Sequence, residues 1–294
     1  MYRGRHPKRT AMRNVREIVK LSLFFVFGIA FVTGAFMAGK ILIEQKKASD
    51  AYDSIQLNRQ NIPVITPEET GENTVEDNSI EVIEPEPNME STPQHIISMD
   101  FRPLQEINTE IVAWLFAEGT PIDYPVLHTD NNSYYLNHLY NGESNKSGSL
   151  FLDYRNTGRF TERNTVIYGH YMNNDTMFGS LKLYKEQDFY EEYPTMLLYT
   201  PEGDYLIELI CGTVEDGNYE FVQFEFEDED AFAEYVDAFR SRSTFQSNVK
   251  LEPGDRIISL CTCSYEWNNA RYMVIGKLTP VMGTGIYTTL NRTP

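Results

Sequence analysis

Cysteine is scarce in this sequence, which holds three cysteines in 294 residues, at Cys211, Cys261 and Cys263. Three are too few for the disulfide framework that holds small secreted domains together. Cys261 and Cys263 stand two apart in a predicted strand, so their Cα atoms are about 6.5 Å apart, near the upper limit for a bridge. We therefore expect free thiols. No Cys-x-x-Cys or His-x-x-x-His spacing indicates a metal site, and we expect no cofactor.

Basic residues are also scarce after the first 20 positions. Residues 1–20 carry seven Lys or Arg against one acid, whereas the rest of the chain has a net charge of −24 and the whole chain −18. Nucleic-acid phosphates require a positively charged surface. The acidic body therefore argues against a nucleic-acid-binding protein.

Charge is missing altogether from Leu21 to Gly39, an apolar run of 19 residues. At a rise of about 1.5 Å per residue, such a helix just spans a hydrocarbon core of roughly 30 Å. The basic flank precedes the run, which predicts a cytoplasmic N-terminus with the remainder outside. The alternative is a cleaved signal peptide, but Ala35 to Ala38 is a poor small-x-small site and the run exceeds a usual signal core. We therefore favour an uncleaved single-pass anchor.

The segment 40–96 separates this anchor from the rest of the chain. Ile41 to about Asn58 continues as a predicted membrane-proximal helix. From Asn61 to Ile96 there are nine acidic residues, five prolines and no Lys or Arg, a composition that cannot bury enough apolar surface to fold alone. The predicted organisation is a basic tail (1–20), an anchor (21–39), this membrane-proximal segment and linker (40–96), and an extracellular domain (97–294).

The extracellular domain is predicted to be mostly β. Helical spacing covers residues 100–113, 132–139, 177–193 and 228–240. Apolar or alternating runs bounded by turn residues predict strands at 114–116, 122–127, 148–153, 165–170, 195–200, 205–214, 256–263 and 270–278. About eight short strands with local helices are typical of a closed β-barrel.

Three side chains supply the parts of an acyl-transfer site. Cys263 ends one predicted strand, Arg271 opens the next, and His170 ends the strand that begins at Thr165. An imidazole can move protons for a thiol nucleophile, and a guanidinium can stabilise the charge that develops on a carbonyl oxygen. Each residue also has a plain structural interpretation, because a strand Cys is usually core and lone His or Arg side chains usually make ordinary polar contacts.

Several motifs resemble the sortase family. Ser259 to Cys263 (Ser-Leu-Cys-Thr-Cys) is similar to the sortase signature Thr-Leu-x-Thr-Cys, with an Arg eight residues later. Ile167 to Met172 resembles the segment that carries the sortase histidine. The likeness covers about Asp100 to Leu278, and further motifs are similar to class B: 122–126, 148–151, 176–181 and 199–203.

This resemblance implies an eight-stranded sortase-type barrel with peripheral helices. It also implies a membrane-anchored cysteine transpeptidase and endopeptidase, with Cys263 as nucleophile, His170 as proton partner and Arg271 at the oxyanion or substrate. The chain departs from the family pattern at three positions: Ser259 replaces the first Thr, Cys261 fills the variable position, and Ser264 stands where class B members often have an acid. We expect Cys261 to be a wall residue, that is, to line the site without a chemical role.

The implied substrate is a surface protein with a C-terminal sorting signal of the Asn-Pro-x-Thr-x or a related Pro-x-Thr type. Its Thr carboxyl would be joined to an amine of the peptidoglycan cross-bridge. Leu260, Thr262, Trp267 and Asn268 are the expected substrate contacts, the last two in a loop that can also be read as an ordinary hydrophilic turn. The expected pocket lies between the helix 228–240, the loop that follows it and the loop 264–270.

Two alternative functions stay open at this point. One is a pilin-polymerising sortase, in which a pilin Lys supplies the acceptor amine. The other is a non-catalytic, membrane-tethered binding or scaffold domain on the same fold.

The predicted topology is testable in intact protoplasts of a Gram-positive-type cell. We expect external protease to cut within residues 61–96 and to release the domain that follows, because the basic flank keeps the N-terminus inside. The released fragment is detected by immunoblotting with an antibody against the domain. Complete protection of the domain until the membrane is lysed would show the opposite orientation.

Overall fold

The structure is a computed structural model that describes residues 8–60, 94–95, 97–217, 220–263 and 269–283. The helices are α1 (Lys8–Gln60), α2 (Arg102–Ile107), α3 (Gln187–Glu192) and α4 (Glu229–Arg240), with the 3₁₀ helices η1 (Tyr134–Leu136) and η2 (Gly179–Lys185). The strands are β1 (Gln94–His95), β2 (Ile111–Phe116), β3 (Asp123–Leu127), β4 (Leu150–Leu152), β5 (Asn164–Tyr168), β6 (Thr195–Tyr199), β7 (Tyr205–Asp216), β8 (Arg256–Cys263), β9 (Ala270–Pro280) and β10 (Met282–Gly283). The chain divides into two compact units, Met1–Ala51 and Tyr52–Pro294.

The second unit is built on a closed barrel of eight strands in the order β2-β3-β4-β5-β8-β9-β7-β6. Two neighbouring pairs, β3 with β4 and β5 with β8, are parallel, and the other pairs are antiparallel. Pairing of β2 with β6 closes the ring. The predicted eight-stranded barrel is therefore confirmed. A separate two-stranded ribbon pairs β1 with β10.

The helix α1 contains the apolar run predicted from the sequence. The portion Lys20–Gln56 is long and apolar enough to cross a membrane by length and composition. Its apolar side chains between Leu21 and Ile43 are largely exposed to the surroundings, as expected of a helix whose partner is lipid. This helix is therefore consistent with an anchor.

The helix predicted over residues 100–113 is wrong in its second half. α2 ends at Ile107, and Ile111 begins strand β2. Asn108 has an extended backbone, with φ −154° and ψ 116°, and its side chain accepts a hydrogen bond from the Glu110 amide at 3.0 Å. This local bond ends the helix, and the β-branched residues that follow pair with β3 instead.

Two smaller differences concern local structure. The segment 132–139 contains only the single 3₁₀ turn η1, rather than a short α-helix. Gln94 and His95, which the sequence placed at the end of the linker, pair with Met282 and Gly283. The remainder of the predicted linker, residues 61–93 and 96, lies outside the described residues.

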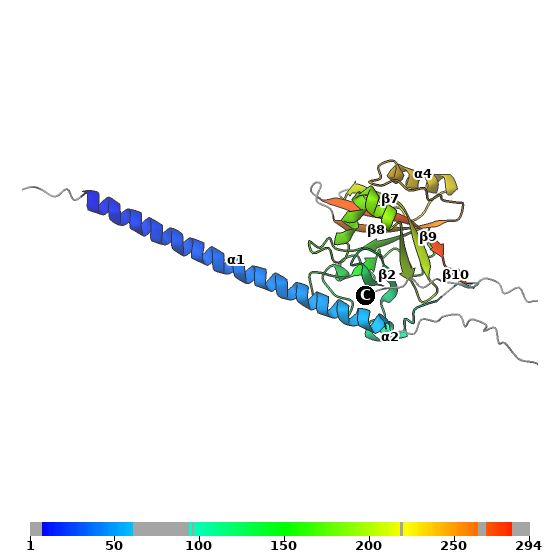
Figure 1. Cartoon of the computed structure of the whole chain (residues 1–294), viewed down its shortest axis with the longest axis horizontal. Helices are drawn as coiled ribbons and strands as arrows, with labels where there is room; N and C mark the ends of the chain where they lie inside the picture. Colours follow the sequence, from blue (N-terminus) through cyan, green and yellow to red (C-terminus); the bar gives the residue numbers. More distant parts are fainter. Residues whose placement is uncertain (1–7, 61–93, 96, 218–219, 264–268, 284–294) are drawn as a thin grey trace, which may run out of the picture. The chain divides into compact units, whose positions relative to one another are not determined.

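The helix α4 forms an outer layer over one face of β8 and β9. Its buried side chains Phe232, Val236 and Phe239 belong to one cluster with residues of the barrel wall, namely Ile210, Cys211, Ile257, Met273 and Ile275. Figure 1 shows α4 beside β7 and β8. Because side chains alternate along a strand, the odd-numbered residues of β8 face this layer and the even-numbered ones face the opposite side.

The first turn of α4 is stabilised by Asp228, whose side chain accepts a hydrogen bond from the Ala231 amide at 2.8 Å. We expect Asp228→Ala to lower the free energy of unfolding by about 1 kcal/mol, because a helix N-cap is lost. The melting temperature should fall by about 2–4 °C for a domain of this size.

The matched control is Glu234→Ala, which removes the same charge from the exposed middle of α4. Its unfolding free energy should change by no more than about 0.5 kcal/mol. Thermal unfolding followed by circular dichroism compares the two variants, and equal melting temperatures would contradict the capping role.

Candidate active site

His170 and Cys263 are brought to the same end of the barrel by the parallel pairing of β5 with β8. The register places Tyr168 opposite Cys261, and the Gly169 amide continues the ladder by donating to the Cys261 carbonyl at 3.2 Å. His170 is two residues beyond Tyr168, and Cys263 is two residues beyond Cys261. Because the two strands are parallel, both residues follow the last matched pair at one end of the barrel.

Arg271 lies on the next strand of the barrel, β9. β8 and β9 are antiparallel, and Cys263 is paired directly with Arg271. Paired residues in antiparallel strands project to the same side of the sheet. Cys263 also shares its side of β8 with Cys261, by alternation. The backbone thus pairs Cys263 with Arg271 on neighbouring strands, and His170 follows the end of β5, the strand on the other side of β8. The Cys263 side chain lies outside the described residues.

The His170 ring is held by a backbone carbonyl. Its Nε2 lies 2.6 Å from the carbonyl oxygen of Leu136, in η1. A carbonyl can only accept a hydrogen bond, so Nε2 must carry the proton. In the neutral ring the lone pair is then on Nδ1, which becomes the position that can accept a proton from a thiol.

A glycine fits against the other side of this ring. Gly148 has φ +61°, and a Cβ placed there would lie 2.5 Å from the Tyr135 carbonyl oxygen, 2.9 Å from the Leu136 carbonyl oxygen and 3.1 Å from Cδ2 of His170. Only glycine tolerates both this backbone conformation and this close approach. Gly148 begins the predicted strand 148–153, but neither its approach to His170 nor the role of the Leu136 carbonyl was predicted from the sequence.

The His170 backbone is fixed as well. Its carbonyl accepts a hydrogen bond from the Phe178 amide at 3.0 Å, and Tyr171 forms a bridge with Met177. These contacts explain why the segment that follows β5 turns back against the barrel. Within the described part of the chain, the His170 ring is held by the Leu136 carbonyl.

The Arg271 side chain is half-buried beside β7. One guanidinium nitrogen donates to the Ala270 carbonyl at 3.1 Å. A Cβ on Gly217 would lie 3.1 Å from the guanidinium carbon of Arg271, so the missing side chain of Gly217 leaves room for the guanidinium. Glu215, which is opposite Arg271 in the β7–β9 register, accepts from Arg242 at 2.9 Å.

The other two thiols are enclosed by protein. Cys211 is fully buried, and desolvation raises the pKa of its thiol to about 12. Cys261 is 2% exposed and lies opposite Tyr168. Because the thiolate is the reactive form, a buried thiol with a raised pKa is a poor nucleophile near neutral pH. The placement of Cys261 agrees with the expected wall residue.

The expected substrate contacts fall into two groups. Leu260 and Thr262 are 0% and 2% exposed and lie on the face of β8 opposite to that of Cys263. Thr262 Oγ1 is buried and makes no hydrogen bond within the described part of the chain. Trp267 and Asn268 lie outside the described residues. A role in substrate binding stays a prediction for all four residues.

A buried carboxylate that the sequence did not reveal supports β5. Arg155 donates to both oxygens of Asp153 at 2.9 Å, and Asn132 and the Tyr168 hydroxyl donate to Asp153 at 3.0 and 3.1 Å. Burial by itself raises the pKa of Asp153, but the hydrogen bonds from Arg155 and Asn132 outweigh it and leave the pKa below its usual range. This network fixes Tyr168, two residues before His170.

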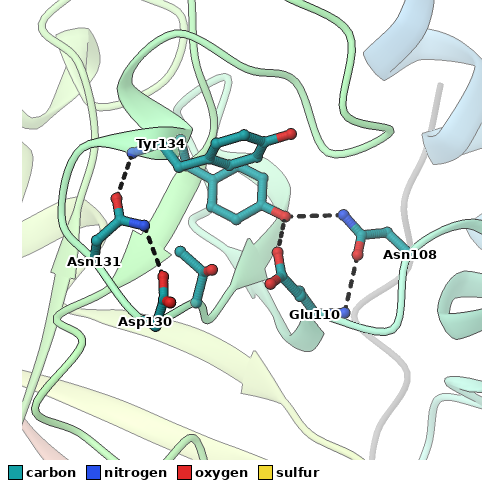
Figure 2. Close-up of a pocket in the computed structure, with 7 residues that line it drawn as sticks. Asn108, Glu110, Asp130, Asn131 and Tyr134 are labelled. Carbon is teal, nitrogen blue, oxygen red and sulfur yellow. Dashed lines mark hydrogen bonds between the residues drawn. The ribbon is translucent and has the colours of Figure 1, made fainter.

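A polar surface pocket of about 320 Å³ is lined in part by η1 (Figure 2). Its lining consists of Asn108, Glu110, Thr129, Asp130, Asn131, Tyr134 and Tyr135, and includes none of the predicted site residues. The Tyr135 hydroxyl donates to Glu110 and accepts from Asn108 at 2.9 Å. These bonds fix η1, the segment whose Leu136 carbonyl holds His170.

The comparisons with known proteins agree with this geometry. A sequence-family model described as "Sortase domain" matches residues 115–279. The sortase B of Listeria monocytogenes is 37% identical over 181 residues, which are 61% of this chain and 74% of that protein.

Solved structures give the same result. A Staphylococcus aureus sortase B–substrate complex is similar with a TM-score of 0.59 and 31% identity, over 62% of this chain and 85% of that chain. Sortase B from Bacillus anthracis in complex with AAEK1 has a TM-score of 0.67 over 82% of this chain and 100% of that chain, and its 24% identity supports the fold alone.

The role of Gly148 is testable by Gly148→Ala. We expect the alkylation of Cys263 by iodoacetamide at pH 7 to slow by on the order of tenfold, because the added methyl group displaces His170 from the thiol. Mass spectrometry of cysteine-containing peptides distinguishes Cys263 from the two buried thiols.

The control is Gly254→Ala. Gly254 also has a positive φ of +87°, but a Cβ there meets nothing within 4 Å. Both variants therefore share the backbone strain, and only Gly148→Ala introduces a collision beside His170. Equal alkylation rates in the two variants would remove Gly148 from the site.

Proposed function

The chain belongs to the sortase family, and we propose that it is a membrane-anchored, class B-like cysteine transpeptidase in which Cys263, His170 and Arg271 act together. The observation that supports this proposal most directly is the register of β5, β8 and β9, which pairs Cys263 with Arg271 and ends β5 two residues before His170 at the same end of the barrel. Their residue types are those that thiol-dependent acyl transfer requires.

In the first half of the reaction, the Cys263 thiolate attacks the carbonyl carbon of the Thr in a sorting signal. His170, with Nε2 bonded to Leu136, carries the proton at Nδ1 and delivers it to the leaving amine as the peptide C–N bond breaks. Arg271 stabilises the negative charge on the carbonyl oxygen. The products are a thioester on Cys263 and a released C-terminal peptide.

In the second half, an acceptor amine attacks the thioester. Nδ1 of the neutral His170 takes the proton of the attacking amine, an amide bond forms, and the Cys263 thiolate leaves. The enzyme returns to its starting state, with the imidazolium ring ready to protonate the next leaving group. No oxidant or other co-reactant is required.

The proposed substrate is a sorting signal of the Asn-Pro-x-Thr-x or related Pro-x-Thr type, and the proposed acceptor is an amine of the peptidoglycan cross-bridge. The sortase B–substrate complex of S. aureus supports a peptide substrate. We place the catalytic domain outside the cell, with the N-terminus in the cytoplasm and the helix α1 as a single-pass anchor. The division into tail, anchor, linker and domain at residues 20, 39 and 96 is part of the same proposal.

The test uses the full chain in detergent, incubated with sorting-signal peptides and an amine. We expect Cys263→Ala to abolish both the thioester adduct and the ligated product, because the nucleophile is lost. His170→Ala should lower turnover by on the order of 10²-fold or more. Arg271→Lys should also cause a large loss, because Lys keeps the charge but lacks the planar guanidinium.

The matched control is Cys261→Ser, which replaces the neighbouring buried thiol on the same face of β8. Its turnover should stay near that of the wild type. Turnover that survives Cys263→Ala would show that the nucleophile is wrong. Complete absence of an adduct with every peptide would favour the non-catalytic binding domain, and acceptance of pilin Lys in preference to cross-bridge amines would favour the pilin-polymerising alternative.

A further inference from the structure

The last turns of α1 that belong to the second unit make specific contacts with the barrel. Tyr52 is 3% exposed and Ile55 is fully buried. The Tyr52 ring packs edge-on against Tyr124, with 5.0 Å between ring centroids, and in a tilted arrangement against Tyr140, at 5.5 Å. Gln56 donates to the Asp123 carbonyl at 2.8 Å. Sequence reasoning placed these residues in a membrane-proximal segment and assigned them no role at the site.

The Tyr52 hydroxyl reaches the segment that supports His170. It donates to the Gly148 carbonyl at 2.8 Å and lies 2.9 Å from Ser149 Oγ. These polar groups are buried away from water. Loss of the Tyr52 hydroxyl would therefore leave the Gly148 carbonyl without this hydrogen bond, at a cost in free energy. Tyr52 therefore restrains the backbone of Gly148 and Ser149 directly.

Three further contacts continue from this segment to the His170 ring. The Ser149 amide donates to the Tyr135 carbonyl at 2.9 Å, next to the Leu136 carbonyl that accepts from His170. Ser149 Oγ donates to the His138 carbonyl at 3.0 Å, which fixes the far end of the η1 turn. Gly148 itself lies against both the Leu136 carbonyl and the His170 ring.

We propose that Tyr52 is a positioning residue for His170, whose hydroxyl fixes Gly148 and Ser149 and thereby the Leu136 carbonyl that orients the imidazole. This proposal rests on the proposed function, since it assigns Tyr52 to the same reaction. The proposed contact links α1, the helix that precedes the linker, to His170, the proton partner of Cys263. Tyr52 does not touch the reacting atoms, and it acts through the backbone of 148–149 and through η1.

The test compares Tyr52→Phe with Gln56→Leu in the full chain in detergent. Tyr52→Phe keeps the ring and its packing but removes the hydroxyl, whereas Gln56→Leu removes a hydrogen bond from the same helix to β3 that does not lead to His170. We expect Tyr52→Phe to lower kcat by roughly tenfold with KM changed less than about twofold, because the imidazole is misplaced while the peptide still binds. Gln56→Leu should leave kcat within about twofold of the wild type.

A spectroscopic measurement tests the positioning without substrate. In chains labelled with ¹⁵N-histidine, the His170 signals are assigned by their absence in His170→Gln. The wild type should show the Nε2-protonated tautomer that the bond to Leu136 requires. In Tyr52→Phe the share of this tautomer should fall, and in Gln56→Leu it should not change.

Two results would overturn the proposal. One is a Tyr52→Phe variant with the kcat and the His170 spectrum of the wild type. The other is an equal loss in both variants, which would show that α1 merely stabilises the fold. A wild-type chain without Cys263-dependent turnover would contradict the proposed function instead, and the ¹⁵N comparison would still decide whether Tyr52 orients His170.

Discussion

The parallel pairing of β5 with β8 is the constraint on which the rest of this structure depends. It joins two strands that are far apart in the sequence and pairs Tyr168 with Cys261, which lie two residues before His170 and Cys263. The register is held by a buried hydrogen bond from Ser259 to Asn164, 95 positions away, at 2.9 Å. A shift of one residue would turn Cys263 to the opposite face of β8, away from Arg271. The same ladder is therefore one of the pairings of the barrel and brings His170 and Cys263 to one end of it.

Burial makes two of the three thiols poor candidates for chemistry. Cys211 is enclosed under α4, where desolvation raises its pKa, and Cys261 is almost fully buried beside Tyr168. Cys263 differs from Cys261 by its position at the end of β8, where it is paired with Arg271.

Glycines shape the space around both polar side chains of the site. Gly148 lies against the His170 ring, and Gly217 lies against the Arg271 guanidinium. At each place a methyl group would come within about 3 Å of the functional side chain. The imidazole is then oriented by a backbone carbonyl, which holds the ring in one tautomer without adding a second charge to an already acidic chain. Rigid backbone on both sides provides the orientation that catalysis requires.

The sequence by itself determined the elements whose signals are local. The uncharged run 21–39, the alternation of 256–263, the helical spacing of 228–240 and the motifs around His170 and Cys263 each depend on neighbouring residues, so the apolar helix, the helix α4 and the strands were predictable. The tertiary structure decided the non-local features. Helical spacing over 100–113 was overridden by pairing of Ile111 with Leu127. The Leu136 carbonyl, the buried Asp153 and the Tyr52 contact arise where distant segments meet, and no local pattern encodes which backbone groups will pack together.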